Sequence, residues 1–512
     1  MNVIMVMSDT FRRDNLACYN SEARYAPNLD GFAEEAVVFD KAFCGSFPTV
    51  PNRNDLLTSR HTFTYKDWEP LGEEELVLPE VLGEAGVLTC AVFDTPHPFT
   101  PGFNYQRGFD VWEQIRGQET DRWKSYPKDV TFPCDVSKLR NPTTVVQYLR
   151  NVHDRRTEED YFCARTVKAA MDWLERNRER EPFFLYVDLF DPHEPWDPPQ
   201  YYVDRYFPGY TGEQVIYPRY DHCSFLSDEE LRYCQALYRG KVTMVDRWIG
   251  MLMERIRSLG LWGDCAVIFT SDHGFYLGEH GYIGKSLVTE TYQQCLPMYP
   301  EVCSIPLLMH VPGLPTGNME ALVQSVDIPA TVCDFLDVAI PSRFEGHSVL
   351  PLLQGEVSAL RRVAISSPRL SGRGVRIPHP SSRSSITDGE WLLVYGSQVA
   401  LDEVDGRSDL LYGGKKQRWD AERTAERQAV GHRVKTEASI TTRMVDGLER
   451  ELHAIEEGAF EPELYHIAVD PGCHEDVLAS ERKKAESLHS EFARFLGTHG
   501  VRQDHLEYFQ RL

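Results

Sequence analysis

Short apolar runs alternate with helical segments along most of the chain, and this pattern is typical of an α/β fold with a mostly parallel sheet. The apolar runs that we predict as strands cover residues 2–7, 88–93, 183–188, 265–270 and 306–310. We therefore expect a large mixed, mostly parallel sheet sandwiched by helices. A smaller α+β subdomain is expected to follow it at the C-terminal end.

Two of the intervening helices are well marked by their apolar faces. The first is predicted at about 158–176, with one face formed by Ala164, Val167, Met171 and Leu174. The second is predicted to begin at Ser227, because Ser227 and Glu230 have the spacing of a capping box. Its apolar stripe consists of Leu231, Cys234, Tyr238, Val242, Val245, Ile249 and Leu252.

The composition changes after about residue 355, so we divide the chain into a catalytic α/β domain at 1–360 and a C-terminal subdomain at 361–512. Residues 366–383 are rich in Ser, Arg, Gly and Pro and are predicted to form an exposed loop. A strand is predicted at 390–395. The highly charged stretch at 403–460 has an apolar stripe at Met444, Leu448, Leu452 and Ile455, which predicts an inserted helical arm for packing or oligomer contact rather than a substrate lid.

Composition and charge exclude some classes of function. A net charge of −24 over 512 residues argues against nucleic acid as a partner, because nucleic acid requires a basic face. It does not exclude a small anionic substrate, since a metal ion and a few basic residues can invert the local field. The 12 cysteines have irregular spacing and form no disulfide framework or CxxC zinc pattern, so reduced and mostly buried thiols are expected.

The sequence shows no segment that points to a membrane. A strand begins at once with Val3, and we find neither a basic and apolar leader nor an apolar run of about 18 residues. We therefore expect a cytoplasmic protein with no membrane partner. The charged arm is compatible with a homo-oligomer.

Candidate chemistry gathers where the predicted strands end. Asp9 follows the first strand, and Asp272 and His273 follow the strand at 265–270. Ligand sites in open α/β sheets lie beyond the carboxyl ends of the strands. A carboxylate oxygen and an imidazole nitrogen offer a mixed donor set to a divalent ion.

Two longer motifs accompany these residues. Residues 46–60 read Ser-Phe-Pro-Thr-Val-Pro-Asn-Arg-Asn-Asp-Leu-Leu-Thr-Ser-Arg, and residues 270–285 read Thr-Ser-Asp-His-Gly-Phe-Tyr-Leu-Gly-Glu-His-Gly-Tyr-Ile-Gly-Lys. The first resembles the type I sulfatase signature, Cys-x-Pro-Ser-Arg followed by Leu-Leu-Thr-Gly-Arg, with matches at Pro51, Arg53, Leu56, Leu57, Thr58 and Arg60. Thr49 then occupies the position of the cysteine that those enzymes oxidise to formylglycine. Threonine cannot be oxidised in this way, so no formylglycine is expected.

The resemblance places the chain in the alkaline phosphatase superfamily and implies its fold. It implies that Asp9, Asp272 and His273 bind the metal and that Lys285 contacts the transferring group. Asp9 is followed by threonine rather than by a second aspartate, and the spacing of Asp9, Arg12 and Asp14 is closer to the phosphonate monoester hydrolase and phosphodiesterase branch. Glu279 and His280 also match the family pattern and are expected to be structural or to support the ligands.

Further site residues follow from the same resemblance. Thr49 is the expected nucleophile, with Arg53 steadying it, and His193 is expected to protonate the leaving group, a task that suits an imidazole pKa near neutrality. His97 keeps a histidine of the family, while Thr95 replaces the family's lysine as a weaker candidate for a substrate contact. Cys44 and Ser46 are rival nucleophiles, but neither has the arginine and the Leu-Leu-Thr run at the family spacing.

The implied metal site consists of Asp9, Asp272, His273 and the Thr49 hydroxyl. This mixed set favours Mn²⁺ or Zn²⁺, with Ca²⁺ also compatible. A second metal would need another cluster, and the spacing of the available residues, Asp188, Asp191, His193 and His347, does not match that of true phosphatases, so one ion is expected.

The expected activity is hydrolysis of a phosphodiester or phosphonate monoester through a phospho-Thr49 intermediate, because a threonine ester has no formylglycine-type route for release. Three alternatives stay open: a sulfatase with unmodified Thr49, a phosphoryl transferase, and a silent binding protein. The lack of transmembrane helices disfavours the transferase. Aromatic residues in 97–155 and 196–226 either line an aryl or sugar pocket or cover the sheet; they include Trp112, Trp123, Tyr126, Tyr201, Tyr202 and Tyr206.

Overall fold

The computed structural model describes residues 1–288, 293–372, 375, 378, 380–398 and 460–512. The helical arm predicted at 403–460 lies outside these residues, apart from Phe460. Within the described part, no helix combines the length and apolar character needed to cross a bilayer.

An eight-stranded sheet forms the centre of the described structure, in the order β14-β2-β13-β8-β1-β6-β4-β5. Neighbouring strands are parallel except where β13 lies antiparallel to both β8 and β2. The bounds are β14 Gly317–Met319, β2 Val37–Phe39, β13 Leu307–His310, β8 Cys265–Thr270, β1 Asn2–Ser8, β6 Phe183–Leu189, β4 Leu88–Phe93 and β5 Val111–Gln114. The five predicted strands and the fold class are confirmed.

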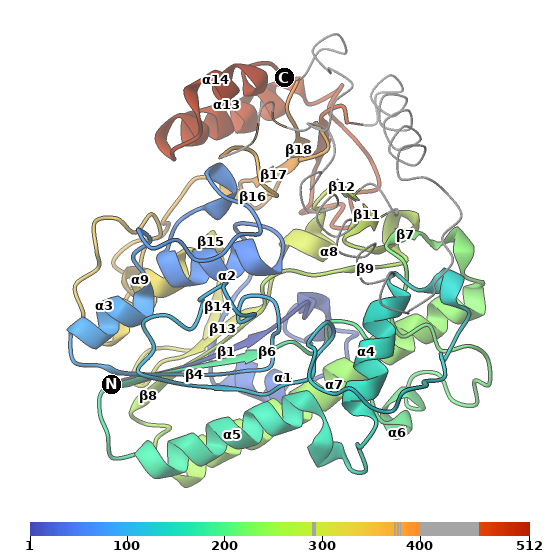
Figure 1. Cartoon of the computed structure of the whole chain (residues 1–512). Helices are drawn as coiled ribbons and strands as arrows, with labels where there is room; N and C mark the ends of the chain where they lie inside the picture. Colours follow the sequence, from blue (N-terminus) through green and yellow to red (C-terminus); the bar gives the residue numbers. More distant parts are fainter. Residues whose placement is uncertain (289–292, 373–374, 376–377, 379, 399–459) are drawn as a thin grey trace.

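Helices cover both faces of this sheet (Figure 1). On β1, Ile4 and Val6 face the core formed with α1 (Pro27–Glu34), α5 (Phe162–Asn177) and α7 (Asp228–Ser258). Val3, Met5 and Met7 face the opposite core, formed with α2 (Thr49–Thr58), α3 (Leu78–Glu84) and α9 (Asp327–Phe335). Burial of both faces explains why the central strands are continuous apolar runs rather than alternating ones.

Both predicted helices are confirmed. The capping box between Ser227 and Glu230 is present at the start of α7. Helix α5 begins at Phe162 rather than at about 158, because residues 158–160 form a separate 3₁₀ turn and Tyr161 is extended. The twelve cysteines are all free thiols, and ten of them are buried, as expected.

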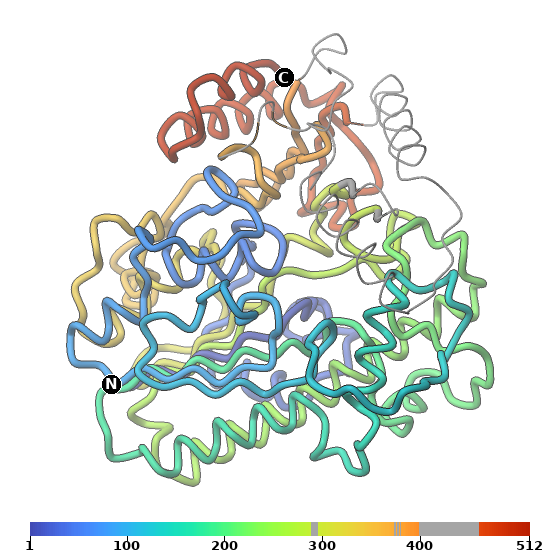
Figure 2. Tube along the Cα trace, in the orientation of Figure 1, coloured from blue at the N-terminus to red at the C-terminus, as the bar shows by residue number. Residues whose placement is uncertain are grey.

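The C-terminal part forms a second, antiparallel sheet in the order β16-β17-β18-β19. Its strands are β16 Ala364–Ser366, β17 Ser384–Thr387, β18 Leu392–Tyr395 and β19 Glu463–Tyr465. Helix α13 (Arg482–Thr498) packs on it with Leu488 and Phe492, and α14 (Gln503–Leu506) follows. Figure 2 shows these C-terminal helices (red) beside the blue segment near residue 63, whose Phe63 belongs to the same core. The domain boundary at 360 stays a prediction.

The prediction of an exposed loop at 366–383 is wrong for the described residues, most of which are buried. The segment lies against the chain around α2: the amide of Ser367 donates to Gly45 O (3.0 Å) and that of Leu370 to Phe63 O (2.9 Å). Small residues permit this approach, since a Cβ at Gly372 would lie 2.2 Å from Tyr65 O. The composition of residues 366–383 correctly predicted irregular structure, but it could not show which other segment of the chain would bury these residues.

The remaining elements are short or peripheral. The helices are α4 Pro142–Val152, α6 Gln200–Val203, α8 Pro300–Cys303 and α10 Leu350–Leu353. The strands are β3 Ala42–Phe43, β7 Asp221–His222, β9 Tyr276–Leu277, β10 Tyr282–Gly284, β11 Ser286–Val288, β12 Gln293–Cys295 and β15 Val323–Gln324.

Candidate active site

Thr49 is the first residue of α2 and is buried. Its Oγ1 lies 3.4 Å from His273 Nε2. The first N–H groups of a helix have no acceptor within the helix, so they can meet an anion. The predicted nucleophile and a predicted metal ligand therefore lie side by side at a helix N-terminus.

Three predicted metal ligands meet at the carboxyl ends of β1 and β8. These strands are parallel neighbours with Met7 opposite Thr270, so the residues that follow them emerge at the same edge. One ligand atom from each of Asp9, Asp272 and His273 lies within 4.8 Å of the others, and all three residues are fully buried.

The donor atoms of this cluster suit a cation. His273 Nδ1 lies 2.9 Å from Gly274 O, so this nitrogen carries the proton and leaves the Nε2 lone pair toward Thr49 and Asp272. Asp9 Oδ2 is buried without a hydrogen bond, although Arg53 Nη1 lies 3.0 Å away as an ion pair. Two carboxylates, one of them with an orphaned oxygen, and one neutral imidazole fit one divalent ion.

Burial dominates the electrostatics of the cluster. Burial and the neighbouring charge of Asp272 raise the pKa of Asp9 well above its ordinary value. Burial also opposes ionisation of Asp272, but His273, Arg53 and Lys285 together lower its pKa. Burial lowers the pKa of His273 to about 3, which keeps its imidazole neutral.

Arg53 lies one helical turn after Thr49 and forms ion pairs with several carboxylates at once. Its Nη1 lies 2.7 Å from Asp272 Oδ2, and its Nε and Nη2 bind both oxygens of Asp188 at 2.9 and 2.8 Å. A bidentate pair of this kind fixes the guanidinium plane. Arg53 thus holds the ends of β1, β6 and β8 against the start of α2.

The backbone is constrained around the ligands. Thr10 has φ +60°, an unfavourable value for a β-branched residue, and its N–H and hydroxyl bind Asp272 and Asp9 at 2.9 and 2.7 Å. A Cβ at Gly274 would lie 1.9 Å from Glu301 O. Local strain and close approach at both strand ends are typical of a functional site.

Lys285 connects the ligands with His193. Its Nζ lies 3.3 Å from His273 Nε2 and 3.2 Å from His193 Nε2. Burial lowers the pKa of Lys285, so its ammonium group gives up a proton more readily than an exposed one.

The folded site shifts His193 away from the intrinsic pKa that suits a histidine to proton transfer. Burial and the charge of Lys285 lower the pKa of His193 well below its ordinary value. Its Nδ1 lies 2.7 Å from Glu194 O, which leaves Nε2 as an acceptor facing Lys285. An anionic substrate nearby would raise the pKa of this imidazole again.

His97 lies in a neighbouring polar group. Its Nε2 lies 2.8 Å from Glu119 Oε2, and the other oxygen of Glu119 accepts from Tyr217 Oη at 2.6 Å. Phe190 separates His97 from His193, with ring centroids 5.7 and 4.1 Å away, respectively. His97 thus faces the same region as His193, and its catalytic role stays a prediction.

Thr95 is fully buried, and its hydroxyl donates to Asp188 Oδ1 at 2.6 Å. Because this bond uses the hydroxyl proton, Thr95 orients the carboxylate that binds Arg53. The structure gives it a positioning contact rather than an open donor, and its predicted role as a substrate contact stays a prediction.

The rival nucleophiles are engaged elsewhere. Ser46 Oγ donates to Asp55 (2.7 Å) and accepts from the Phe63 amide (2.9 Å). Cys44 is fully buried, and burial raises the pKa of its thiol well above the ordinary value. Thr49 is therefore favoured over both.

The residues considered for a second metal do not form a cluster with one another in the described part of the chain. Asp188 binds Arg53, Asp191 binds Lys241 at 2.7 Å, and His347 is exposed. Glu279 accepts from Arg12 Nη1 at 2.7 Å, in agreement with a structural role.

Sequence reasoning missed part of this region. The Arg140 guanidinium lies 4.0 Å from the Tyr220 ring centroid and 3.2 Å from Glu194 Oε1. No local signal marks Arg140, which precedes α4. Asp188 was considered only for a second metal, and its pairing with Arg53 was not predicted. Three of the predicted pocket aromatics cover α7 and its surroundings: Tyr201 and Tyr202 bind Glu158, and Tyr206 binds Thr243.

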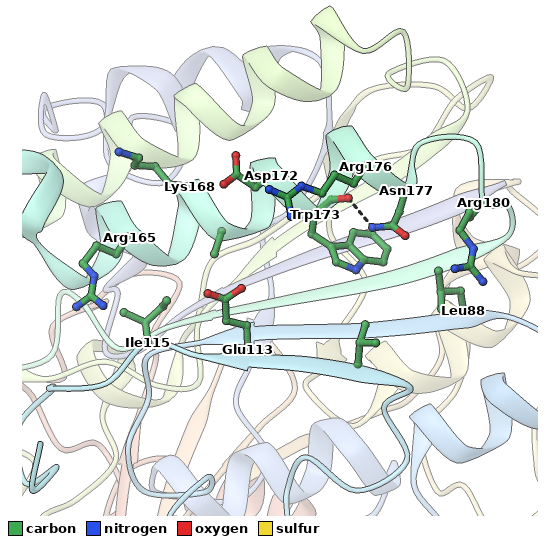
Figure 3. A pocket seen from close by; sticks show the side chains of 12 residues that line it. Leu88, Glu113, Ile115, Arg165, Lys168, Asp172, Trp173, Arg176, Asn177 and Arg180 are labelled. Carbon is green, nitrogen blue, oxygen red and sulfur yellow. Dashed lines mark hydrogen bonds between the residues drawn. The ribbon is translucent and has the colours of Figure 1, made fainter.

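A separate cavity of about 720 Å³ lies between α5 and the β4–β5 edge (Figure 3). Trp173, Glu113 and several basic side chains of α5 line it. It includes none of the predicted site residues, so the candidate site is defined by the strand ends and α2.

The comparisons with known proteins show which family the chain resembles. The sequence profile of the sulfatase family matches residues 1–338. An arylsulfatase of Clostridium perfringens is 24% identical over 410 residues, which cover 70% of this chain and 80% of that protein. A multifunctional alkaline phosphatase superfamily protein of Trinickia caryophylli is 23% identical over 414 residues, covering 69% and 77%.

A solved structure has a similar fold over the full length. The phosphonate monoester hydrolase of Agrobacterium radiobacter superposes with a TM-score of 0.66 at 19% identity, covering 98% of this chain and 96% of that chain.

Proposed function

The chain belongs to the sulfatase family of the alkaline phosphatase superfamily, and we propose that it hydrolyses a phosphodiester or a phosphonate monoester through a covalent phospho-Thr49 intermediate. The observation that carries the proposal is the position of the Thr49 hydroxyl, 3.4 Å from His273 Nε2 at the start of α2. A threonine cannot become formylglycine. The fold similarity to a phosphonate monoester hydrolase supports the same substrate class.

The cofactor would be one divalent ion, held by Asp9, Asp272, His273 and the Thr49 hydroxyl. The buried donors and the orphaned Asp9 oxygen support this assignment. Their mixed oxygen and nitrogen character favours Mn²⁺ or Zn²⁺, and Ca²⁺ is compatible. When bound, the ion would acidify the Thr49 hydroxyl and offset negative charge on the substrate.

Each residue of the site would have its own role in the reaction. The Thr49 hydroxyl loses its proton to solvent, and Oγ1 attacks phosphorus while the bond from phosphorus to the leaving oxygen breaks. Lys285 Nζ offsets charge on the nonbridging oxygens, and His193 Nε2 gives the leaving oxygen a proton. Lys285 lies 3.2 Å from that nitrogen and can supply the proton. Water then attacks phosphorus and gives one proton to the departing Thr49 oxygen, which restores the hydroxyl, and Lys285 takes up a proton again from solvent.

Hydrolysis of a sulfate ester by unmodified Thr49 is the second candidate, because the family and the arylsulfatase relative favour it. It would need a base aimed at the covalent intermediate. A silent binding protein is less favoured, since Arg53 and Lys285 contact Asp272 and His273, and Lys285 also contacts His193.

The test is turnover by protein reconstituted separately with Mn²⁺, Zn²⁺ and Ca²⁺ on matched nitrophenyl esters: a phosphodiester, a phenylphosphonate, a phosphomonoester and a sulfate. We expect the first two to be turned over fastest. Thr49→Ala should lower kcat on the order of 10³-fold or more, while Thr49→Ser retains activity. Mass spectrometry of quenched enzyme should find phosphate on Thr49. Dominant sulfate turnover, or full activity of Thr49→Ala, would contradict the proposal.

A further inference from the structure

A buried carboxylate with an orphaned oxygen lies beside His193. Glu194 follows this histidine in the loop after β6 and is fully buried. Its Oε2 has no hydrogen-bond partner, although His193 Nδ1 lies 3.2 Å away. A buried polar atom of this kind requires an explanation. Its place next to the expected proton donor points to a role in proton transfer.

The other oxygen of Glu194 is held by two distant segments of the chain. Tyr220, directly before β7, donates its hydroxyl to Oε1, and Arg140, which precedes α4, has Nη1 3.2 Å from the same atom. The Arg140 guanidinium also lies 4.0 Å from the Tyr220 ring centroid, so the two holding groups pack on each other. Together they fix the carboxylate with its free oxygen toward the imidazole.

Charged and polar neighbours support the ionised form of Glu194 against burial. Burial raises the pKa of this carboxyl, and nearby Glu119 adds to the rise, while Arg140, Lys285 and the Tyr220 hydroxyl act to lower it. Burial also raises the pKa of Tyr220, so its hydroxyl keeps the proton that it donates. Arg140 thus supplies the cation that a buried carboxylate needs.

We propose, on the basis of the function given above, that Glu194 is a positioning residue, which holds the Nδ1–H group of His193 and stabilises the imidazolium while His193 protonates the leaving oxygen. The two ring nitrogens have different neighbours. Nε2 lies 3.2 Å from Lys285 Nζ, whereas Nδ1 lies 2.7 Å from Glu194 O and 3.2 Å from Glu194 Oε2. The carboxylate therefore lies on the side of the ring that takes no part in the transfer.

The charge of Glu194 matters during one step. A proton that passes from Lys285 Nζ to His193 Nε2 makes the ring cationic until Nε2 gives a proton to the leaving oxygen. Burial and the ammonium group of Lys285 oppose this cation, as the lowered pKa of His193 shows. A carboxylate beside Nδ1 orients an imidazole and stabilises its protonated form. Glu194 itself gains and loses no proton.

The experiment compares two substrates that differ only in the leaving group, 4-nitrophenyl phenylphosphonate and phenyl phenylphosphonate, on the metal-reconstituted full chain. Phenol has a pKa of about 10, so its departure depends on protonation far more than that of the more acidic nitrophenol. Glu194→Gln keeps the shape and removes the charge. It should lower kcat/KM at least about tenfold for the phenyl ester, but less than about threefold for the nitrophenyl ester. Glu194→Asp should recover part of the loss.

Asp246→Asn is the matched control. Asp246 is also a fully buried carboxylate, but it accepts from the amides of Asn28 and Leu29 at the start of α1. This variant should respond to the leaving group as the parent does. Tyr220→Phe, which removes the hydrogen bond to Oε1, replaces Glu194→Gln if that variant does not fold, and should show the same pattern with a smaller loss. Equal losses on both esters, or no loss, would overturn the proposal.

Proton NMR of the substrate-free protein tests the contact independently of turnover. The His193 Nδ1–H resonance, assigned by its absence in His193→Gln, should move upfield in Glu194→Gln, because the carboxylate no longer faces this proton. An unchanged resonance would rule out the role of Glu194, whether or not the parent hydrolyses an ester. A parent that shows the shift in Glu194→Gln but turns over no ester would count against the proposed hydrolysis and leave the contact supported.

Discussion

Each end of helix α2 has a cluster of histidine and carboxylate side chains, and the two clusters differ in charge and in access to solvent. At the first residue, Thr49, the cluster of Asp9, Asp272 and His273 is fully buried. Beyond the last turn, only His61 of the second cluster is buried, while Glu345 and His499 are partly exposed.

The arginines at the two ends show what this difference means. Arg53 contacts Asp9, Asp188 and Asp272, with only 2% of its side chain exposed. Arg60 contacts Glu345 with 29% of its side chain exposed. Charges taken out of water need full compensation, whereas those near solvent do not. The first end of α2 therefore holds buried charges that depend on Arg53, whereas water can screen the charges at the second end.

The largest effect is expected from removing the buried arginine. Arg53→Met leaves three buried carboxylates without their cation, so we expect it to lower the free energy of unfolding by about 3–5 kcal/mol in metal-free buffer. Saturating Mn²⁺ should restore part of the loss. The measurement is urea unfolding with and without metal, and Arg60→Met is the control, expected to cost about 0–1 kcal/mol. An equal loss of unfolding free energy in Arg53→Met and Arg60→Met would contradict the difference between the two ends of α2.

The next effect concerns catalysis at the first end of α2. Lys285→Met should lower kcat by about 10²–10³-fold, because a fixed cation facing the transferring group is lost. Lys285→Arg should recover part of the rate, and the two variants should bind the same amount of metal. Steady-state kinetics separate this from weaker binding: a rise in KM with unchanged kcat would show that Lys285 serves only to bind substrate.

A pH-dependent effect is expected at the second end. Burial alone would raise the pKa of Glu345, but the hydrogen bonds from His61 and the charge of Arg60 lower it from 4.5 to about 2. A carboxylate with a lowered folded pKa stabilises the fold above the unfolded pKa of 4.5, and this contribution is lost as the pH falls from 4.5 toward 2.

Glu345→Gln should therefore lower the free energy of unfolding by about 2–3 kcal/mol near pH 7, and by much less near pH 2. Urea unfolding in the presence of a chelator, at a series of pH values, measures this difference. A destabilisation that does not change with pH would mean that Glu345 acts through its shape and not through its charge.

The smallest effect is expected for His499→Phe. The swap conserves volume and the stack on Phe495, so the free energy of unfolding should change by less than about 1.5 kcal/mol. A large loss would show that the histidine is needed for its hydrogen bonds rather than for its shape.

Several features could be predicted because they depend on neighbours along the chain. The apolar runs of β1 and β8 predicted the strands, and the strand ends located Asp9, Asp272 and His273. Ser227 and Glu230 predicted the start of α7, since a capping box is a local arrangement. The burial of residues 366–383 and the position of Arg140 beside Tyr220 depend on segments distant in sequence, so composition could not predict them.

By itself, the sequence determined the order of strands and helices along the chain, because periodicity is a local property. The candidate ligands and Thr49 at the nucleophile position followed from the resemblance of two motifs to the sulfatase pattern. Only the tertiary structure decided which charges meet: Arg53 with three carboxylates, Lys285 with two histidines, and His61 with His499. It also decided the protonation of His193, since burial and a nearby ammonium group, rather than residue type, lower its pKa. Desolvation and the charges of spatial neighbours depend on how distant segments pack against one another. The pattern of residues along the chain does not contain this information.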